Sequence, residues 1–341
     1  MLNNTYRAAQ VTAPGVLDMV TRDLLEPAPG FVRIRVEACG VCHSDAATVD
    51  AVFPIAFPRV PGHEVIGIID AVGEGVAGWR IGQRVGVGFL GGACGWCEMC
   101  HEGDLVNCRN QEITGVHLDG GYAESMHARA AALVAIPDEF EPEEAAPLLC
   151  AGLTTFNAIR KSPARAGDRL AVLGIGGLGH LALQYAHKMG FDTVAIGRGA
   201  DKEDLARSLG ANHYIDGDAV DVGDALMALG GMHVVVATAP GAKAISACLR
   251  GLRERGRLVV VAAAHEPIEI AASDLIFGGR GIDGSLTGDI AATEATLAFS
   301  RQASVRPVIE TMPLERAPEA YAAMMAGKAR FRIVLTMGKS A

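Results

Sequence analysis

The sequence has no long hydrophobic run, no excess of basic residues and no low-complexity tract. No run of about eighteen apolar residues occurs in the 341 residues, so neither a membrane-spanning helix nor a membrane partner is expected. The first residues, MLNNTYRAAQ, lack a charged head followed by an apolar segment, which predicts no secretory signal peptide and a cytoplasmic location. Acidic residues exceed basic ones by nine, which argues against a nucleic-acid partner.

The composition is that of a globular protein with room for two domains. Half of the residues are apolar and 20% are charged, and the length exceeds that of one ordinary domain. Up to about residue 150 we predict a β-rich region, because short apolar runs such as FVRIRVEA and VIGIIDAVG alternate with glycine and proline turns.

Beyond residue 150 the pattern predicts alternating strands and helices. The segment LAVLGIGGLGHLALQYAHKMGFDTVAIG is typical of a buried strand, a glycine turn, a helix and a second strand. One helical stripe is formed by Leu178, Leu181, Ala182, Tyr185, Ala186 and Met189, and Gly190 is a stop signal. The alternation continues to about residue 287, which predicts a doubly wound parallel sheet.

The expected fold class is therefore α/β with two domains. Residues 150–286 form the doubly wound domain, and residues 1–149 and 287–341 form the β-rich domain, since the alternation ends near residue 287 and the last segment returns to the first domain.

Four of the eight cysteines follow the pattern C-x2-C-x2-C-x7-C. They are Cys94, Cys97, Cys100 and Cys108. In a reducing compartment clustered cysteines favour metal binding over disulfides. Four thiolates can close a tetrahedral zinc site with no open position, which makes it structural. An iron–sulfur cluster uses similar spacing and is the alternative; unrelated free thiols are the third interpretation.

A second group of possible metal ligands is scattered along the chain. Cys42 stands in CGVCHSD, His63 in PGHEVIG and Cys150 in APLLCAGLTTFNAI. Two thiolates and a neutral imidazole balance the charge of a zinc ion and leave its fourth position open, as in catalytic sites. The residues alone leave another interpretation open, because buried cysteines and hydrogen-bonded histidines are common without a metal.

The stretch GIGGLG between a strand and a helix fits a dinucleotide-binding turn. Gly174, Gly176 and Gly179 give G-x-G-x-x-G, with Gly177 and Leu178 between the last two. The first glycine permits the turn, the second lets the backbone approach a pyrophosphate at the helix N-terminus, and the third lets helix and strand pack closely.

These motifs occur in an order and at spacings that resemble the zinc-dependent alcohol dehydrogenases of the medium-chain dehydrogenase/reductase family. The motifs are GVCHSD, PGHE, the four-cysteine segment, GGYAE, LLCAGLTT and GIGGLG. The segment GSLTGDIAATEATLAFSRQ looks like the tail of the yeast-type and cinnamyl-alcohol branch. The likeness covers almost the whole chain and implies a GroES-like catalytic domain and a Rossmann domain.

The resemblance implies a role for each matching residue. Cys42, His63 and Cys150 match the ligands of a catalytic zinc, and the four clustered cysteines match those of a structural zinc, so two zinc ions per chain are expected. Ser44 matches the hydroxyl that takes the alcohol's proton. Asp45 matches the carboxylate that orients the zinc-bound imidazole.

Further matches concern the surroundings of that site. Glu64 matches a glutamate that assists ligand exchange, or is simply a carboxylate beside the metal. His43 and Arg332 match residues that touch the cofactor pyrophosphate, and Phe53 and Phe89 match aromatic walls of the substrate pocket.

One position departs from the pattern, and two cysteines have no counterpart in it. Where the yeast-like pattern has a histidine three residues after the relay hydroxyl, this chain has Ala47, so a proton leaving Ser44 must pass through the cofactor ribose and water or by another route. Cys39 and Cys248 match nothing and are expected in the core.

The end of the second strand in TVAIGRGADK favours NADP over NAD. No acidic residue stands there to accept the ribose hydroxyls; Gly197 leaves room for a phosphate, Arg198 offers a planar fork for it, and Lys202 follows closely. In the alternative interpretation Arg198 is a solvated loop charge and Asp201 or another group holds the ribose of NAD.

The resemblance implies a zinc-dependent alcohol dehydrogenase or aldehyde reductase that transfers a hydride between a primary alcohol or aldehyde and a nicotinamide cofactor. The aromatic walls indicate medium aliphatic or aromatic substrates. Relatives of this length imply a homo-oligomer, a tetramer or a dimer. A polyol or formaldehyde dehydrogenase on the same fold and a non-catalytic binding protein that keeps the fold are the alternatives.

Overall fold

The computed structural model describes residues 4–263 and 266–338, which form two compact units. Of these residues, unit 1 comprises 4–150, 288–302 and 307–338, and unit 2 comprises 151–263, 266–287 and 303–306. The predicted domains divide the chain after residues 149 and 286, whereas the units divide it after Cys150 and Thr287 and assign 303–306 to unit 2. Each unit is described by itself.

Unit 1 is built on a mixed sheet in the order β16-β17-β3-β4-β5-β9, with β8 also paired to β3. Its strands are β3 (Phe31–Val41), β4 (Val65–Val72), β5 (Arg84–Val87), β8 (Ser125–Arg129), β9 (Leu133–Ala135), β16 (Ile309–Pro313) and β17 (Arg332–Thr336). Two further antiparallel pairs are β1 (Thr5–Ala13) with β2 (Val16–Asp23), and β6 (Leu90–Gly92) with β7 (Glu112–Ile113). In β3 the apolar residues Val32, Ile34 and Val36 alternate into the core, as the sequence predicts.

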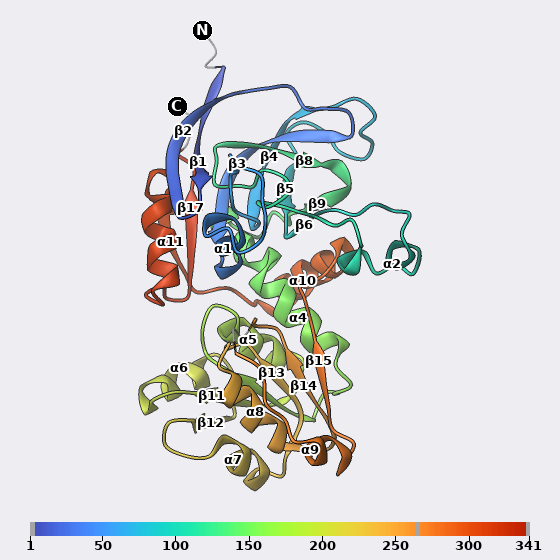
Figure 1. Cartoon of the computed structure of the whole chain (residues 1–341), viewed down its shortest axis with the longest axis vertical. Coiled ribbons are helices and arrows are strands. Elements are labelled where there is room, and N and C mark those ends of the chain that lie inside the picture. Colours follow the sequence, from blue (N-terminus) through green and yellow to red (C-terminus); the bar gives the residue numbers. More distant parts are fainter. Residues whose placement is uncertain (1–3, 264–265, 339–341) are drawn as a thin grey trace. The chain divides into compact units, whose positions relative to one another are not determined.

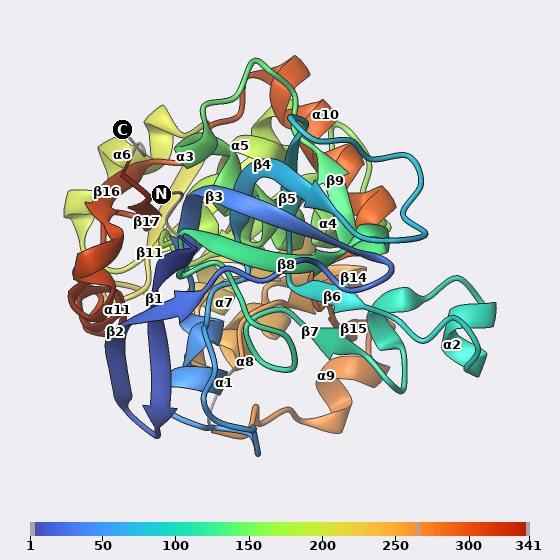
Figure 2. The same ribbon diagram turned by 90° about the horizontal axis from the view of Figure 1, so that it is seen from above.

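The helices of unit 1 are short apart from two near the end of the chain. They are α1 (Ala46–Val49), α2 (Glu98–His101), α3 (Pro142–Ala145), α10 (Ile290–Ala303) and α11 (Ala317–Met325). The first 150 residues are thus β-rich, as predicted. The segment that carries α2 projects away from the sheet beyond β6 and β7 (Figures 1 and 2).

Unit 2 contains a parallel sheet in the order β12-β11-β10-β13-β14-β15. The strands are β10 (Arg169–Leu173), β11 (Asp192–Gly197), β12 (His213–Asp216), β13 (Met232–Ala237), β14 (Leu252–Val260) and β15 (Gly281–Gly284). The order turns back at β10, which lies between β11 and β13. In doubly wound sheets ligands bind beyond the carboxyl ends of the strands at such a switch point.

The helices of unit 2 are α4 (Ala151–Lys161), α5 (Gly179–Lys188), α6 (Glu203–Ser208), α7 (Val222–Ala228), α8 (Ala242–Arg250) and α9 (Ala272–Ile276). Helix α5 packs on β10, β11 and α4, whereas α7 and α8 pack on each other and on β14 (Figure 1). Right-handed crossovers put the helices that lead toward β12 and those that lead toward β15 on opposite faces. This is the predicted doubly wound arrangement.

The predicted elements of unit 2 are present with small shifts at their ends. Leu181, Tyr185 and Ala186 are buried on α5, and Gly190 has a φ of 85° just beyond its end, the left-handed conformation of a helix stop. The last predicted strand, RLVVVAA, begins earlier than expected, at Leu252. The register against β13 shifts between Met232 and Val234, so a bulge absorbs the added residues.

Among the residues placed in the structure, no helix is long and apolar enough to cross a membrane.

Candidate metal centres and dinucleotide turn

Strand pairing brings two of the candidate zinc ligands, Cys42 and His63, to one edge of the sheet in unit 1. Cys42 follows the last residue of β3 directly, and His63 stands two residues before Val65, the first residue of β4. The two strands are antiparallel with Cys39 opposite Val65, so the end of one lies beside the start of the other. Cys150 follows the short 3-10 helix Ala146–Leu149, and its sulfur lies 3.7 Å from that of Cys42.

The spacing of these donor atoms fits a tetrahedral zinc ion. Zinc–sulfur bonds of about 2.3 Å at tetrahedral angles separate two sulfurs by about 3.8 Å, close to the observed 3.7 Å. The donor atoms of Cys42, His63, Glu64 and Cys150 all lie within 4.8 Å of one another. The Nε2 atom of His63 is buried and has no hydrogen-bond partner, as expected of a ring nitrogen kept for a metal.

The other ring nitrogen of His63 is held by Asp45. His63 Nδ1 lies 2.9 Å from Asp45 Oδ1, and Asp45 Oδ2 accepts from the Cys42 backbone N–H at 2.9 Å and from the Tyr122 hydroxyl at 2.8 Å. A carboxylate on Nδ1 fixes the proton there and leaves Nε2 as the ligand. The structure thus places Asp45 where the predicted orienting role requires it.

The two thiols and the imidazole influence one another's protonation. The hydrogen bond with Cys150 lowers the pKa of Cys42 well below its usual value, against the effect of burial, with His63 adding to the lowering. The same bond, together with burial, raises the pKa of Cys150. Burial lowers the pKa of His63, but Asp45 and Cys42 outweigh it and raise the pKa. Of the two thiols, Cys42 is therefore the one that the site favours as a thiolate.

Glu64 and Arg332 form a buried ion pair beside these ligands. A guanidinium nitrogen of Arg332 donates to Glu64 Oε1, and both side chains are at most 5% exposed. Burial raises the pKa of Glu64 to about 7 despite Arg332. The second carboxylate oxygen, Oε2, has no partner. Arg332 thus contacts Glu64 in unit 1, and its predicted contact with a cofactor stays a prediction.

The remaining predicted site residues of unit 1 differ in their exposure and in their distance from the candidate ligands. Ser44 and His43 are exposed on the 3-10 helix His43–Asp45 that follows Cys42. The ring of Phe89 lies edge-on to His63 with centroids 5.4 Å apart, so it borders the site. Phe53 is 61% exposed, and its predicted place in the substrate pocket stays a prediction.

The four clustered cysteines form a second candidate metal centre around α2. The separations Cys94–Cys100, Cys97–Cys100 and Cys97–Cys108 are 3.9, 3.6 and 4.0 Å, again near the tetrahedral value of about 3.8 Å. We call residues 94–110 the cysteine lobe. Trp96 in this lobe is 68% exposed.

Main-chain N–H groups surround the sulfurs of the cysteine lobe. Those of Cys94 and Asn110 donate to the sulfur of Cys108 at 3.3 and 3.4 Å. The N–H of Arg109 lowers the pKa of Cys97. Burial raises the pKa of Cys94, but the N–H of Trp96 and other donors bring it down to about 6. These donors favour the thiolate form that a metal requires.

The glycine turn of unit 2 has the shape that a dinucleotide site needs. Gly174 follows β10 with a φ of 94°, and a Cβ on Gly179 would collide with the carbonyl of Gly174, so the third glycine lets α5 approach the strand. A Cβ on Gly176 would meet nothing within 4 Å. The exposed backbone there can approach a pyrophosphate at the N-terminus of α5.

One sequence interpretation at the end of β11 is wrong. A Cβ on Gly197 would lie 2.5 Å from the Tyr214 hydroxyl, so the space beside this glycine is filled by a side chain from β12 and is not left for a phosphate. Tyr214 donates to the Gly199 carbonyl at 2.6 Å. Arg198 is exposed, with no ion pair found for it in the described chain, and Lys202 ends the adjoining 3-10 helix Ala200–Lys202.

Two residues that sequence reasoning did not single out matter here. Asp216, at the end of β12, accepts from the Gly199 N–H at 2.9 Å and puts an acid beside the loop that carries Arg198. Tyr122 contacts Asp45. Tyr122 stands in GGYAE, and its hydroxyl-bearing ring directly after two glycines is the sequence feature that could have drawn attention to it. Cys39 and Cys248 are buried in the two cores, as expected.

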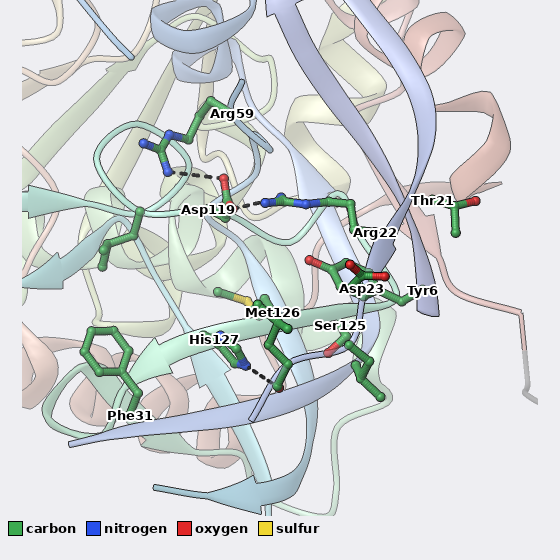
Figure 3. Close-up of a pocket in the computed structure, with 13 residues that line it drawn as sticks. Tyr6, Thr21, Arg22, Asp23, Phe31, Arg59, Asp119, Ser125, Met126 and His127 are labelled. Carbon is green, nitrogen blue, oxygen red and sulfur yellow. Dashed lines mark hydrogen bonds and ion pairs between the residues drawn. The ribbon is translucent and has the colours of Figure 1, made fainter. Parts of the chain in front are cut away.

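A separate cavity of about 580 Å³ opens between the β1–β2 hairpin and β8 in unit 1 (Figure 3). Asp119 bridges Arg22 at 2.8 Å and Arg59 at 3.2 Å on its wall, and His127 Nε2 faces the Leu25 carbonyl at 3.1 Å. None of the residues found to line it belongs to a candidate metal centre.

Comparisons with known proteins match both parts of the chain. A family model described as the alcohol dehydrogenase GroES-like domain matches residues 28–138, and one described as zinc-binding dehydrogenase matches residues 177–302. Alcohol dehydrogenase notN from Aspergillus sp. (strain MF297-2) is 41% identical over 337 residues, which cover 98% of this chain and 99% of that protein.

Two solved structures share the fold over nearly the full length. One, described as an NAD-dependent alcohol dehydrogenase, has a TM-score of 0.91 and 28% identity and covers 97% of this chain and 100% of its own. CAD from Helicobacter pylori complexed with NADP(H) has a TM-score of 0.86 and 29% identity and covers 99% of each chain. These matches extend along nearly the whole chain, and both donor sets are of the kinds that zinc prefers. The chain therefore belongs to the zinc-dependent alcohol dehydrogenases of the medium-chain family, which makes it an oxidoreductase that acts on alcohols with zinc and a nicotinamide cofactor.

Proposed function

We propose that the chain transfers a hydride between a primary alcohol or its aldehyde and NADP(H), with a catalytic zinc on Cys42, His63 and Cys150. One observation carries the proposal: the unpartnered, buried Nε2 of His63 belongs to a donor set with two sulfurs 3.7 Å apart. Three protein ligands leave one tetrahedral position open for substrate. We further propose that a structural zinc binds the cysteine lobe, whose four thiols fill all positions.

The residues around the first site have separate tasks in this proposal. When bound, zinc supplies a Lewis acid that lowers the pKa of an alcohol hydroxyl. Ser44, two residues after Cys42 and exposed, takes the proton from that hydroxyl. Asp45 holds the His63 ring in place. The methyl side chain of Ala47 cannot pass the proton on; when bound, the cofactor ribose would offer with water one route for it, and another route stays open.

Phe89 supports an apolar substrate. Its ring borders His63, so the alkyl or aryl part of a substrate at the open position meets an aromatic wall. We therefore expect benzyl alcohol and medium aliphatic alcohols to be used better than sorbitol or a glutathione adduct of formaldehyde. A steady-state panel of these four compounds separates the proposal from a polyol or formaldehyde dehydrogenase.

The cofactor preference is proposed from Arg198. The comparisons leave it open, because one similar structure is described as NAD-dependent and another was solved with NADP(H). Arg198 is exposed just after β11 with Lys202 close behind, which suits a ribose phosphate. Asp216 already accepts the Gly199 N–H, so this acid is engaged by the protein backbone.

Arg198→Ala tests this preference. A charge-assisted contact of about 1.5–3 kcal/mol corresponds to roughly ten- to a hundredfold in affinity, so the KM for NADPH should rise at least about tenfold while that for NADH barely changes. Equal or better efficiency of the unmodified enzyme with NADH would overturn the NADP preference and leave the zinc assignments intact.

A homo-oligomer is proposed from the open edge of the sheet in unit 2. Strand β15 pairs with β14 on one side, and Ile276, Phe277 and Leu286 near its two ends are 71%, 75% and 56% exposed. Unprotected edges with apolar neighbours favour pairing with another chain. Light scattering on the purified protein should give the mass of a dimer or tetramer.

Metal analysis tests the central proposal. Purified protein should hold about two zinc ions per chain, and a chelator should remove one faster than the other, with turnover lost alongside the faster one. A single zinc ion per chain with full turnover would contradict the assignment of a catalytic zinc to Cys42, His63 and Cys150.

A further inference from the structure

Tyr122 lies fully buried between the two segments that carry Cys42 and His63. Its ring fills the space beside Gly62, the residue before His63, because a Cβ on Gly62 would collide with Cδ1 of the tyrosine. Gly62 has a φ of 100°, the left-handed conformation that glycine adopts without strain. The ring and the turn that presents His63 are thus fitted to each other.

Backbone hydrogen bonds fasten Tyr122 to the same turn. Its N–H donates to the Pro61 carbonyl at 3.0 Å, and the N–H of Gly121 donates to the Gly62 carbonyl at 3.0 Å. The carbonyl of Tyr122 accepts from the Ala9 N–H on β1 at 2.8 Å. With its main chain fixed at both ends and its ring enclosed, the hydroxyl has a defined position.

That hydroxyl reaches across to the other ligand-bearing segment. It donates to Asp45 Oδ2 at 2.8 Å, and the Cys42 N–H donates to the same oxygen at 2.9 Å. The opposite oxygen, Oδ1, faces His63 Nδ1 at 2.9 Å. Donors from three parts of the chain therefore set the plane of one buried carboxylate, and that plane sets the direction of the imidazole.

We propose that Tyr122 is a positioning residue of the metal centre, whose hydroxyl holds Asp45 so that His63 presents Nε2 to the metal. The inference rests on the proposed assignment of Cys42, His63 and Cys150 as ligands. Tyr122 joins the turn before His63 to the carboxylate beside Cys42, and so holds the spacing of two ligands that come from different strands.

Replacing Tyr122 by phenylalanine separates this role from packing. Tyr122→Phe keeps the ring against Gly62 and every main-chain hydrogen bond, and it removes one of the two donors on Asp45 Oδ2. Tyr185→Phe is the matched control, because Tyr185 is equally buried and lies on α5 in unit 2. A role in packing alone would make the two variants alike in their metal binding.

The experiment follows zinc release from the purified holoenzymes into a chelator with a metal-sensitive dye. Loss of a hydrogen-bond partner of a metal ligand costs about 10–100-fold in metal affinity. Because Tyr122 acts through Asp45, we expect the lower end of this range: zinc should leave the Cys42–His63–Cys150 site of Tyr122→Phe about tenfold faster than that of the wild type. The slower phase from the cysteine lobe should not change. Cobalt exchanged into the faster site should show altered visible absorption bands in Tyr122→Phe and wild-type bands in Tyr185→Phe.

The outcomes separate the inference from the assignment beneath it. A wild type with two zinc ions, together with a Tyr122→Phe variant that matches it in zinc release and cobalt spectrum, overturns the inference and leaves the ligands as assigned. A wild type that holds zinc only in the cysteine lobe overturns both. Faster release from both sites to the same extent in Tyr122→Phe and Tyr185→Phe reduces Tyr122 to a packing residue.

Discussion

The two cysteine sites of unit 1 have similar sulfur spacings and opposite surroundings. In the cysteine lobe the proposed ligands come from fifteen consecutive residues, Cys94 to Cys108, and main-chain N–H groups donate to the sulfur of Cys108. In the other site the ligands are separated by up to 108 positions and lie buried. Charged side chains surround them: Asp45 holds His63, and Arg332 pairs with Glu64.

This difference indicates what each site is built to do. Four thiolates with backbone donors would leave no coordination position open, so a metal there would only fasten the chain. Two thiolates and an imidazole leave one position open, and the buried charges around them fix the ligand directions and the local potential. Substitutions of Cys42, His63 or Cys150 should therefore impair turnover, and substitutions of the lobe cysteines should impair stability.

Cys42→Ala should have the largest effect of the substitutions considered. It removes a proposed zinc ligand, so turnover should fall by more than the 10–100-fold that follows loss of a partner outside the ligand shell. Steady-state kinetics and zinc content measure it. Cys39→Ala is the matched control, because Cys39 is a buried cysteine three residues earlier and outside the ligand set. If Cys42→Ala kept its turnover, the proposed catalytic role of this site, and with it the contrast with the cysteine lobe, would be contradicted.

Cys97→Ser should reverse that pattern. Structural zinc is worth about 10–16 kcal/mol in isolated zinc-finger peptides, and with three ligands left we expect a loss of roughly 5 kcal/mol in the free energy of unfolding. For a unit of this size this loss lowers Tm by about 10–20 °C. Calorimetry would show it, while the pH dependence of turnover in the remaining folded enzyme stays unchanged. A normal Tm with turnover abolished would contradict a structural role.

The same contrast explains which parts of the two sites could be predicted from the sequence. The spacing of the lobe cysteines is local, so a cluster of four thiols could be predicted from the residues alone, and which metal it would hold stays a prediction. Cys42, His63 and Cys150 meet through the pairing of β3 with β4 and the placement of a later turn, and only the family resemblance identified them as a set. The alternating strands and helices of unit 2 were predictable because each depends on local periodicity.

Contacts between distant segments account for what the sequence did not predict. Gly197 was interpreted as room for a phosphate, but Tyr214 from the neighbouring strand fills that space. The hydroxyl of Tyr122 meets Asp45 across 77 positions, and no periodicity encodes that meeting. The start of β14 was placed too late because a bulge interrupts its register.

Glu64→Gln should destabilise the protein without touching a proposed ligand. The pair of Glu64 with Arg332 is buried, and the carboxyl, with its pKa raised to about 7 by burial, is ionised above that pH. At pH 8–9, removing it leaves an uncompensated guanidinium away from water, at a cost of about 3–5 kcal/mol. Urea unfolding of the zinc-loaded protein measures the change. If Glu64→Gln unfolded like the wild type, the buried site would not depend on its surrounding charges as the comparison requires.

Glu98→Gln in the cysteine lobe should have the smallest effect. Glu98 pairs with Arg109, and their side chains are 60% and 65% exposed. Water solvates both charges whether or not they meet, so such a pair contributes about 0.2–1 kcal/mol, and raised salt weakens it further. Urea unfolding of Glu98→Gln and Glu64→Gln at low and high salt compares the losses in the free energy of unfolding of the two variants. A loss as large as that of Glu64→Gln would mean that the lobe also relies on charges around its metal, and that the two sites differ less than their exposure indicates.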